Sequence, residues 1–257
     1  MDKSSIAGIA VAIGGIVAGL MLEGGSLQQI LQPTAAMIVL GGTLGAVMLQ
    51  YPLSTVLAAS KQLLKVFTGS APDGEFALRQ LVEFSNKARR NGIISLDQSL
   101  ATVQDPYMKQ ALTLAIDGTD PVELRKIMQL ELDNQTESEE RVPQVFESAG
   151  GFAPTIGILG AVLGLIQVMQ HLDKIDEVGR GIAVAFVATI YGVGSANLLF
   201  LPSAGKLKIR IHEQHLVKQM VLEGVVSILE GLNPRMMELK LRTFLAENKN
   251  PSEGAAA

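Results

Sequence analysis

The chain has 257 residues, a net charge of −4 and no cysteine or tryptophan, and 48% of its residues are hydrophobic against 18% charged. The lack of cysteine excludes thiol catalysis, thiolate zinc sites and disulfides. The acidic balance argues against a nucleic-acid partner. Low charge and 26 glycines favour a membrane protein with a substantial part outside the bilayer.

The first predicted elements are two uncharged runs, residues 4–22 and 34–51. A helix needs about 20 apolar residues to cross a hydrocarbon core of about 30 Å, and lipid leaves helices as the plausible form. A signal peptide is the alternative for the first run, because Lys3 precedes it. The run is long for the apolar part of a signal peptide and lacks a clear cleavage motif before Glu23, so a helical hairpin is favoured.

Residues 52–148 predict a helical region without membrane spans. A helical apolar stripe ends at Asn91-Gly92, and a short second helix can start at Ser95. Asp105-Pro106 and Asp120-Pro121 have the form of an N-cap followed by proline at the first helical position, and Glu123 completes a capping-box pattern. The stripe consists of Phe76, Leu78, Leu81, Val82, Phe84 and Ala88. The last helix can continue toward Phe146, with Pro143 as a potential kink.

Two further uncharged runs follow at residues 149–170 and 181–201, and a tail of helical pattern occupies residues 203–257, interrupted at Asn233-Pro234. Residues 52–148 hold ten of the 21 Lys and Arg residues and the tail holds eight, whereas residues 23–32 hold none. The positive-inside rule therefore places both termini, the long loop and the tail in the cytoplasm. We predict an all-α, multi-pass integral membrane protein with four transmembrane helices and a helical cytoplasmic domain formed by the 2–3 loop and the C-terminal tail.

No enzyme, cofactor or metal constellation is found. His212 and His215 are spaced to share a helix face, but no third ligand accompanies them, so a solvated face is favoured. The four runs contain no Asp, Glu, Lys, Arg or His in their interiors. An ion-coupled machine usually needs an ionisable group in the membrane, so any such group should come from another chain.

Small residues follow one helical face in the third and fourth runs. The third carries Gly150, Ala153, Gly157, Gly160 and Gly164, and the fourth carries Gly181, Ala185, Ala188, Gly192 and Ala196. Such faces allow close helix packing. Because Pro154, Thr155, Thr189 and Asn197 lie in the same runs, a water-accessible path or a partner helix is the other reading.

Three motifs together resemble one family. Residues 185–192 (AFVATIYG), followed by Pro202, resemble a signature of MotA-type flagellar stator subunits, within the MotA/TolQ/ExbB proton channel family. Residues 153–160 (APTIGILG) resemble the entry to that family's third span, and residues 88–97 (ARRNGIISLD) resemble its charged cytoplasmic motif. The resemblance covers almost the whole chain.

The resemblance implies a bacterial inner-membrane homo-pentamer, in contact with lipid, around a dimer of a MotB-type B subunit. The B subunit carries one transmembrane helix with an essential Asp and a peptidoglycan-binding domain. Ions pass between the A and B chains, and the A ring turns and drives a rotor switch protein of FliG type.

Several residues match positions with roles in the family. Arg89 and Asp97 match residues that meet the rotor, with Arg90 assisting; the alternative is a local salt bridge around Gly92. Pro154 and Pro202 match prolines linked to torque and conformational change.

Thr189 matches a threonine that faces the ion path in the family. We assign Thr155 of the third run to the same path. Sodium-type relatives carry threonines at positions 161 and 188, where this chain has Ala161 and Ala188, so we predict that the translocated ion is a proton.

Three other functions are alternatives to the stator assignment. An ExbB/TolQ-type energiser shares the same assembly logic, but such proteins usually have three spans and no rotor to meet the Arg89–Asp97 motif. The small, mildly polar faces of the third and fourth runs, together with Thr189, argue against a membrane scaffold without ion flux. A secondary transporter normally has inverted repeats and a midplane substrate site, and neither is found in the sequence.

Overall fold

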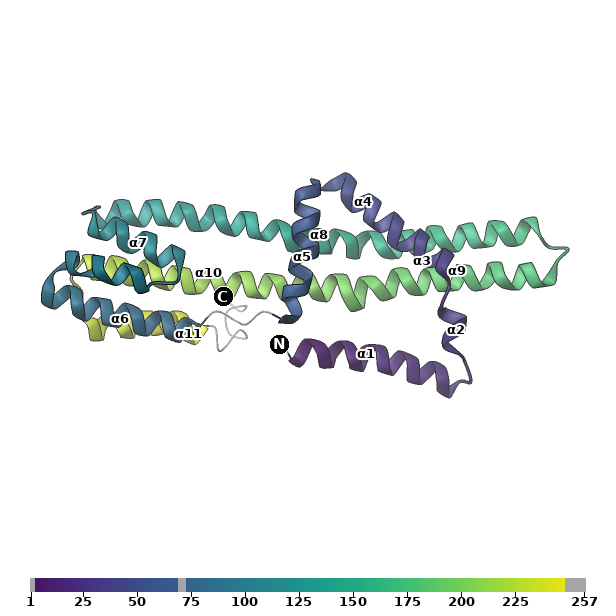
Figure 1. Cartoon of the computed structure of the whole chain (residues 1–257). Coiled ribbons are helices and arrows are strands. Elements are labelled where there is room, and N and C mark those ends of the chain that lie inside the picture. The colour runs from purple at the N-terminus through teal and green to yellow at the C-terminus, as the bar shows by residue number, and fades with distance from the viewer. Residues whose placement is uncertain (1–2, 69–72, 248–257) are drawn as a thin grey trace, which may run out of the picture. The chain divides into compact units, whose positions relative to one another are not determined.

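The computed structural model describes residues 3–68 and 73–247 (Figure 1), and in these ranges every regular element is a helix. The chain divides into two compact units. Within the described residues, the first unit comprises 3–68 and 140–208, and the second comprises 73–139 and 209–247. The last ten residues of the predicted tail lie outside the described part. The predicted all-α class is confirmed.

The first unit begins with an apolar hairpin. Helix α1 spans Lys3–Leu22, and the short helices α2 (Leu27–Ile30) and α3 (Pro33–Ala36) lead into the second span. That span continues as a π-helical segment, η1 (Met37–Gly41), and helix α4 (Gly42–Gln50). Helix α5 (Leu53–Thr68) follows.

Two long helical stretches complete the membrane part. Helix α8 runs without a break over Pro121–Gln170. Helix α9 (Ile175–Ser195) continues through a second π-helical segment, η3 (Ala196–Phe200), into α10 (Leu201–Leu229). Both α8 and α10 contribute residues to both units.

Length and hydropathy identify three candidate membrane-spanning stretches among the described residues. These are Pro33–Gln50, Pro121–Gln170 and Glu177–Leu229, and Ile6–Leu22 is a shorter apolar helix. The long apolar helices confirm the membrane class. The four-span count and the predicted boundaries of the spans stay predictions.

Pro143 and Pro154 both lie inside α8. Proline removes one backbone donor and presses on the preceding turn, so the sequence predicts a potential kink at Pro143. The helix instead continues through both prolines. Near Pro143, the Tyr51 hydroxyl donates to the carbonyl oxygen of Gln144 at 3.1 Å and lies 2.9 Å from Ser148 Oγ. This tyrosine joins the end of the second span to α8.

The second unit packs six helical segments around an apolar core. They are α6 (Gly74–Asn91), the 3₁₀ segment η2 (Ile93–Thr102), α7 (Pro106–Ile116), α11 (Pro234–Glu247) and the parts of α8 and α10 that belong to this unit. The core includes the fully buried side chains Leu81, Met108, Leu124, Met128, Met220 and Leu241.

The predicted caps at Asp105 and Asp120 and the predicted stop at Gly92 are confirmed. Asp105 caps α7, because its Oδ1 accepts from the backbone N–H of Tyr107 at 2.9 Å, and Asp120 caps α8 through Val122 at 2.9 Å. Gly92 ends α6 with φ 81°, a left-handed conformation that suits glycine. The capping-box role of Glu123 stays a prediction, because its carboxylate pairs with Lys126 at 3.6 Å.

Polar contacts hold the helices of the second unit together. Glu223 on α10 accepts hydrogen bonds from both terminal guanidinium nitrogens of Arg125 on α8. It also pairs with Lys240 of α11 at 2.7 Å. Tyr107 is buried and donates to the carbonyl oxygen of Met128 at 3.0 Å. Burial, followed by the nearby carboxylates of Glu131 and Asp133, raises the pKa of Tyr107, so the phenol stays neutral and keeps its donor proton.

Candidate functional site

In the first unit α8 and α9 lie side by side (Figure 1), and their backbones come into close contact along a row of small residues, here called the ladder. A Cβ placed on Gly157 would lie 2.9 Å from the carbonyl oxygen of Ala188, and one on Gly164 would lie 2.8 Å from the carbonyl oxygen of Gly181. Both distances are shorter than real Cβ contacts. The small faces of the third and fourth runs therefore pack against each other, which is the ordinary-packing interpretation.

Pro154 lies at the Ala153–Gly192 end of this ladder. Gly192 of α9 faces it: a Cβ on Gly192 would lie 3.2 Å from Pro154 Cα and 2.5 Å from the carbonyl oxygen of Ala153. Because proline has no N–H, the carbonyl of Gly150 loses its helical donor. The turn of α8 that lacks a hydrogen bond thus lies where the backbone of α9 comes closest, at Gly192.

Pro202 is placed just after the π-helical segment η3. The N–H of Leu201 donates to the carbonyl oxygen of Ala196, a five-residue step. The wider turn of a π-helix leaves room next to the proline ring, and such segments are frequent at functional sites. Pro202 itself is exposed in this chain. Pro202 therefore follows a π-helical segment, whereas Pro154 lies within a stretch that stays α-helical and lacks one backbone hydrogen bond.

The predicted ion-path residues border the ladder without belonging to its buried seam. Thr189 is half-buried, and its Oγ1 donates to the carbonyl oxygen of Ala185 at 3.2 Å. Ala161 is half-buried and follows Gly160, whose Cβ would meet that of Ala188 at 2.8 Å. Thr155 is exposed and donates to Phe152 O at 2.8 Å. Each threonine uses its proton locally and keeps lone pairs for another partner.

Around these residues the outer faces of α8 and α9 are apolar and uncovered by this chain. Side chains exposed by about half or more include Leu159, Val162, Ile166 and Met169 on α8, and Phe186, Ile190 and Val193 on α9. Exposed apolar faces of this extent mark contact with lipid or with another helix. Thr155 is exposed beside these faces, and Ala161 and Thr189 are partly accessible.

Two tyrosine-based tethers were not predicted from the sequence. Besides Tyr51, Tyr191 on α9 donates to the carbonyl oxygen of Ile30 at 2.6 Å and accepts from the N–H of Gln32 at 3.3 Å. It therefore joins the connection between the first two apolar runs to the fourth run. The available signal was an isolated hydroxyl inside an apolar run, since a buried tyrosine O–H usually finds a partner.

The charged motif lies in the second unit, at the end of α6. Arg89 and Arg90 occupy its last turn, Gly92 makes the turn, and Asp97 lies in η2. All three charged side chains are exposed, and within the described part of the chain no ion pair links them to each other or to another residue. The alternative of a local salt bridge around Gly92 is therefore not formed, and these charges are available to a partner.

His212 and His215 do not form a metal site with each other. His212 is exposed, whereas His215 is half-buried and its Nδ1 lies 3.0 Å from Thr136 Oγ1. Among residues 3–68 and 73–247, no group of three or more potential ligands is close enough to hold a metal ion.

Comparison with known families covers nearly the whole chain. A sequence profile of the MotA/TolQ/ExbB proton channel family matches residues 99–220, and one for the N-terminal region of motility protein A matches residues 6–92. Motility protein A of Bacillus subtilis is 33% identical over 249 residues, which cover 95% of this chain and 91% of the relative. Chemotaxis protein PomA of Vibrio alginolyticus is 27% identical, with 98% and 99% covered.

Solved structures agree with the sequence relatives. A chain in the structure of C. jejuni MotAB superimposes with a TM-score of 0.90 at 32% identity, covering 95% of this chain and 96% of that one. A chain of the flagellar MotAB stator complex from Bacillus subtilis gives a TM-score of 0.86 at 32% identity, covering 98% and 100%. The likeness extends over both units.

Proposed function

Because this chain belongs to the motility protein A family and is a flagellar stator A subunit, we propose that its ring conducts protons and turns against the rotor. The relatives of known structure are MotAB complexes, so the chain acts together with a B subunit in a membrane complex of the bacterial motor. We propose four further features of this complex: its stoichiometry, the ion it conducts, its membrane topology and its contact with the rotor.

We place the protein in the inner membrane with four spans and both termini in the cytoplasm. The three long apolar stretches and the shorter helix Ile6–Leu22 supply the spans. The orientation rests on lysine and arginine, which are concentrated in residues 52–148 and in the tail. The second unit, with its capped helices and ion pairs, is then the cytoplasmic domain.

The B subunit supplies the proton carrier in this proposal. The interiors of the four apolar runs contain no acidic or basic residue, while proton movement through a bilayer needs an ionisable group. The uncovered apolar faces of α8 and α9 support contact with a partner helix. A homo-pentamer of this chain around a B dimer would place Thr189, Ala161 and Thr155 along the path.

Proton selectivity follows from the scarcity of oxygen ligands. Alanine stands at positions 161 and 188, and Ala188 is fully buried in the ladder. A sodium ion needs oxygen atoms to replace its hydration shell, whereas a proton needs only a protonatable group and hydrogen-bond partners. The hydroxyl of Thr189 is enough to order such a partner or a water molecule.

Torque transmission is assigned to the two prolines and the charged motif. Pro154 removes one hydrogen bond from α8, and Pro202 follows the π-helical segment η3. Both helical stretches continue into the second unit, so a change at these points would alter the path of α8 and α10. Arg89, Arg90 and Asp97 then meet charges on a FliG-type rotor protein. The observation that carries this proposal is the exposure of these three charges without an ionic partner among residues 3–68 and 73–247.

A matched pair of charge reversals tests the rotor contact. Arg89→Glu should stop or strongly slow rotation of tethered cells, while membrane level and co-purification with the B subunit stay normal. Arg79→Glu makes the same change at an exposed position of the same helix and should leave rotation intact. Wild-type rotation with Arg89→Glu would contradict the assignment.

The energiser and scaffold alternatives have less support. The relatives matched over nearly full length are motility and chemotaxis proteins, and the structural neighbours are MotAB complexes. Their family is one of ion-channel subunits, which agrees with the lack of an enzyme constellation in the sequence.

A further inference from the structure

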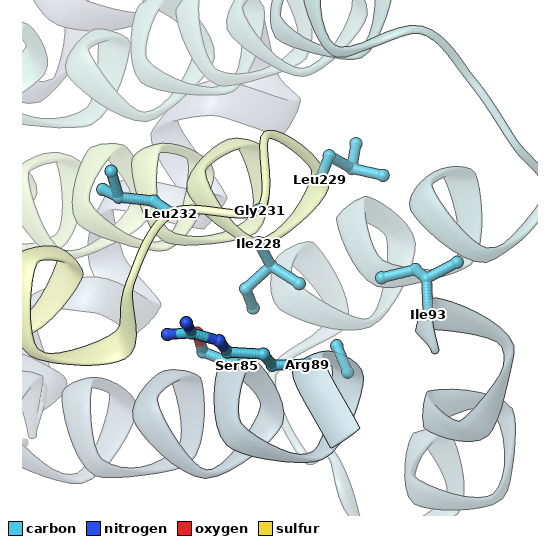
Figure 2. A pocket seen from close by; sticks show the side chains of 8 residues that line it. Ser85, Arg89, Ile93, Ile228, Leu229, Gly231 and Leu232 are labelled. Atoms are coloured by element: carbon cyan, nitrogen blue, oxygen red, sulfur yellow. The ribbon is translucent and has the colours of Figure 1, made fainter. Parts of the chain in front are cut away.

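The second unit contains a pocket beside the charged motif. Its volume is ≈ 250 Å³, and it lies between the last turn of α6, the start of η2 and the end of α10. Figure 2 shows Ile228, Leu229 and Leu232 from α10 and the following turn on one side, and Arg89 on α6 and Ile93 on the other. The other lining residues are Ser85, Ala88 and Gly231.

The walls of this pocket are mainly aliphatic. Ile228 is buried, and Ile93, Leu229 and Leu232 are half-buried and border the opening. An aliphatic cavity of about 150 Å³ can stay free of water and accept a benzene ring. A pocket of ≈ 250 Å³ therefore has room for one large aliphatic or aromatic side chain.

The rim gives this apolar pocket a charge preference. Arg89 lines it and Arg90 follows in the same turn, and neither has an ionic partner among the described residues. A docked side chain would bring its neighbours next to these guanidinium groups. Arginine at an interface favours a carboxylate, to which it can donate two parallel hydrogen bonds.

We propose that the pocket formed by Ala88, Ile93, Ile228, Leu229 and Leu232 accepts an apolar side chain from an acidic helix of the rotor. On that helix an Asp or Glu one turn away pairs with Arg89, because residues three or four apart share a helix face. This inference rests on the proposed rotor contact and adds an apolar anchor to it. The anchor holds the two surfaces in register while the charged groups pair.

Site-specific photocrosslinking in motile cells tests the anchor. Leu229→p-benzoylphenylalanine places the probe at the pocket, and Leu239→p-benzoylphenylalanine places it at an exposed position of α11 that does not line the pocket. The expected result is a cross-link from position 229 to an apolar rotor residue with an Asp or Glu within one helical turn. The probe at position 239 should give no such product.

Two further substitutions link the cross-link to function. Ala88→Leu fills the pocket without changing charge, and Ala101→Leu makes the same change at an exposed position of η2. The filled pocket should lower the yield of engaged complexes and the stall torque about ten-fold, as expected for loss of an interface anchor. Ala101→Leu should change neither, and co-purification with the B subunit checks folding of both variants.

The outcomes separate the anchor from the rotor contact itself. A cross-link from position 229 to a second copy of this chain or to lipid overturns the anchor. So does normal torque with Ala88→Leu. If those results accompany loss of rotation with Arg89→Glu, the anchor is wrong and the charged rotor contact stands. If Arg89→Glu rotates normally while position 229 cross-links to the rotor, the anchor stands and the charge assignment is wrong.

Discussion

Gly192 lies against Ala153 so closely that a Cβ at position 192 would come within 2.5 Å of the Ala153 carbonyl oxygen. The contact is between two backbones, so no side chain can rotate away to make room. It also lies beside Pro154, where α8 lacks one helical hydrogen bond. The packing of α8 on α9 thus depends on a glycine at the position facing a proline.

Gly192→Ala should disrupt the first unit. The added methyl group would force α8 and α9 apart, at a cost of about 1–3 kcal/mol as for other overpacked sites. Gly194→Ala is the matched control, since nothing lies within 4 Å of its Cβ. We expect a lower melting temperature in detergent and loss of rotation for position 192, and little change for position 194. Equal behaviour of the two variants would refute the backbone contact.

Pro202→Ala should separate folding from torque. Restoring the N–H lets the helix close into regular α turns, and an interior proline costs a helix about 3 kcal/mol relative to alanine. The variant should assemble at normal levels and generate less torque in a bead assay. Pro234→Ala, at the first residue of α11 where proline is tolerated, should keep full torque. Undiminished torque with Pro202→Ala would show that η3 and its proline have no part in transmission.

Thr189 can be tested by a pair of substitutions that differ in the hydroxyl. Thr189→Val keeps the shape and removes the oxygen, whereas Thr189→Ser keeps the oxygen that bonds to Ala185. Proton influx into cells that co-produce the B subunit should fall strongly with valine and be largely retained with serine. If valine conducts as well as threonine, the hydroxyl is not part of the path.

The ion cluster on Glu223 should stabilise the second unit. Glu223→Gln leaves Arg125 and Lys240 without their shared carboxylate. Loss of charge-assisted hydrogen bonds of this kind costs about 2 kcal/mol. Thermal unfolding of the purified complex should therefore shift to lower temperature, whereas Glu83→Gln at an exposed position of α6 should leave it unchanged. An unshifted transition for Glu223→Gln would mean that the cluster is solvated and contributes little.

Local signals in the sequence predicted much of the fold. The caps at Asp105 and Asp120 and the stop at Gly92 are short-range features that the chain carries directly in its residue types. The apolar stripe of α6 was also predicted, although Phe76 in the first turn is 47% exposed. The periodicity of that stripe marks a face, and only packing decides how far the end of a helix is covered.

The unpredicted features depend on long-range contacts. The sequence predicted a helix that continues toward Phe146 with Pro143 as a potential kink, but only the structure shows that α8 runs unbroken through both Pro143 and Pro154. The segments η1 and η3 leave no periodicity to detect, because each is a single wider turn. The small-residue faces were recognised, but their mutual contact required the structure. The pocket at Arg89 joins residues about 140 positions apart, beyond the reach of any local pattern.

The most direct test of the stator assignment is rotation in a strain that lacks every homologous A-subunit gene. Such cells should carry assembled filaments that do not turn. Supplying this gene with its B partner should restore rotation, at a speed that is unchanged when sodium is replaced by potassium at fixed pH. Filaments that stay motionless although the complex is present in the membrane would contradict the stator role. A speed that follows the sodium concentration would contradict proton coupling.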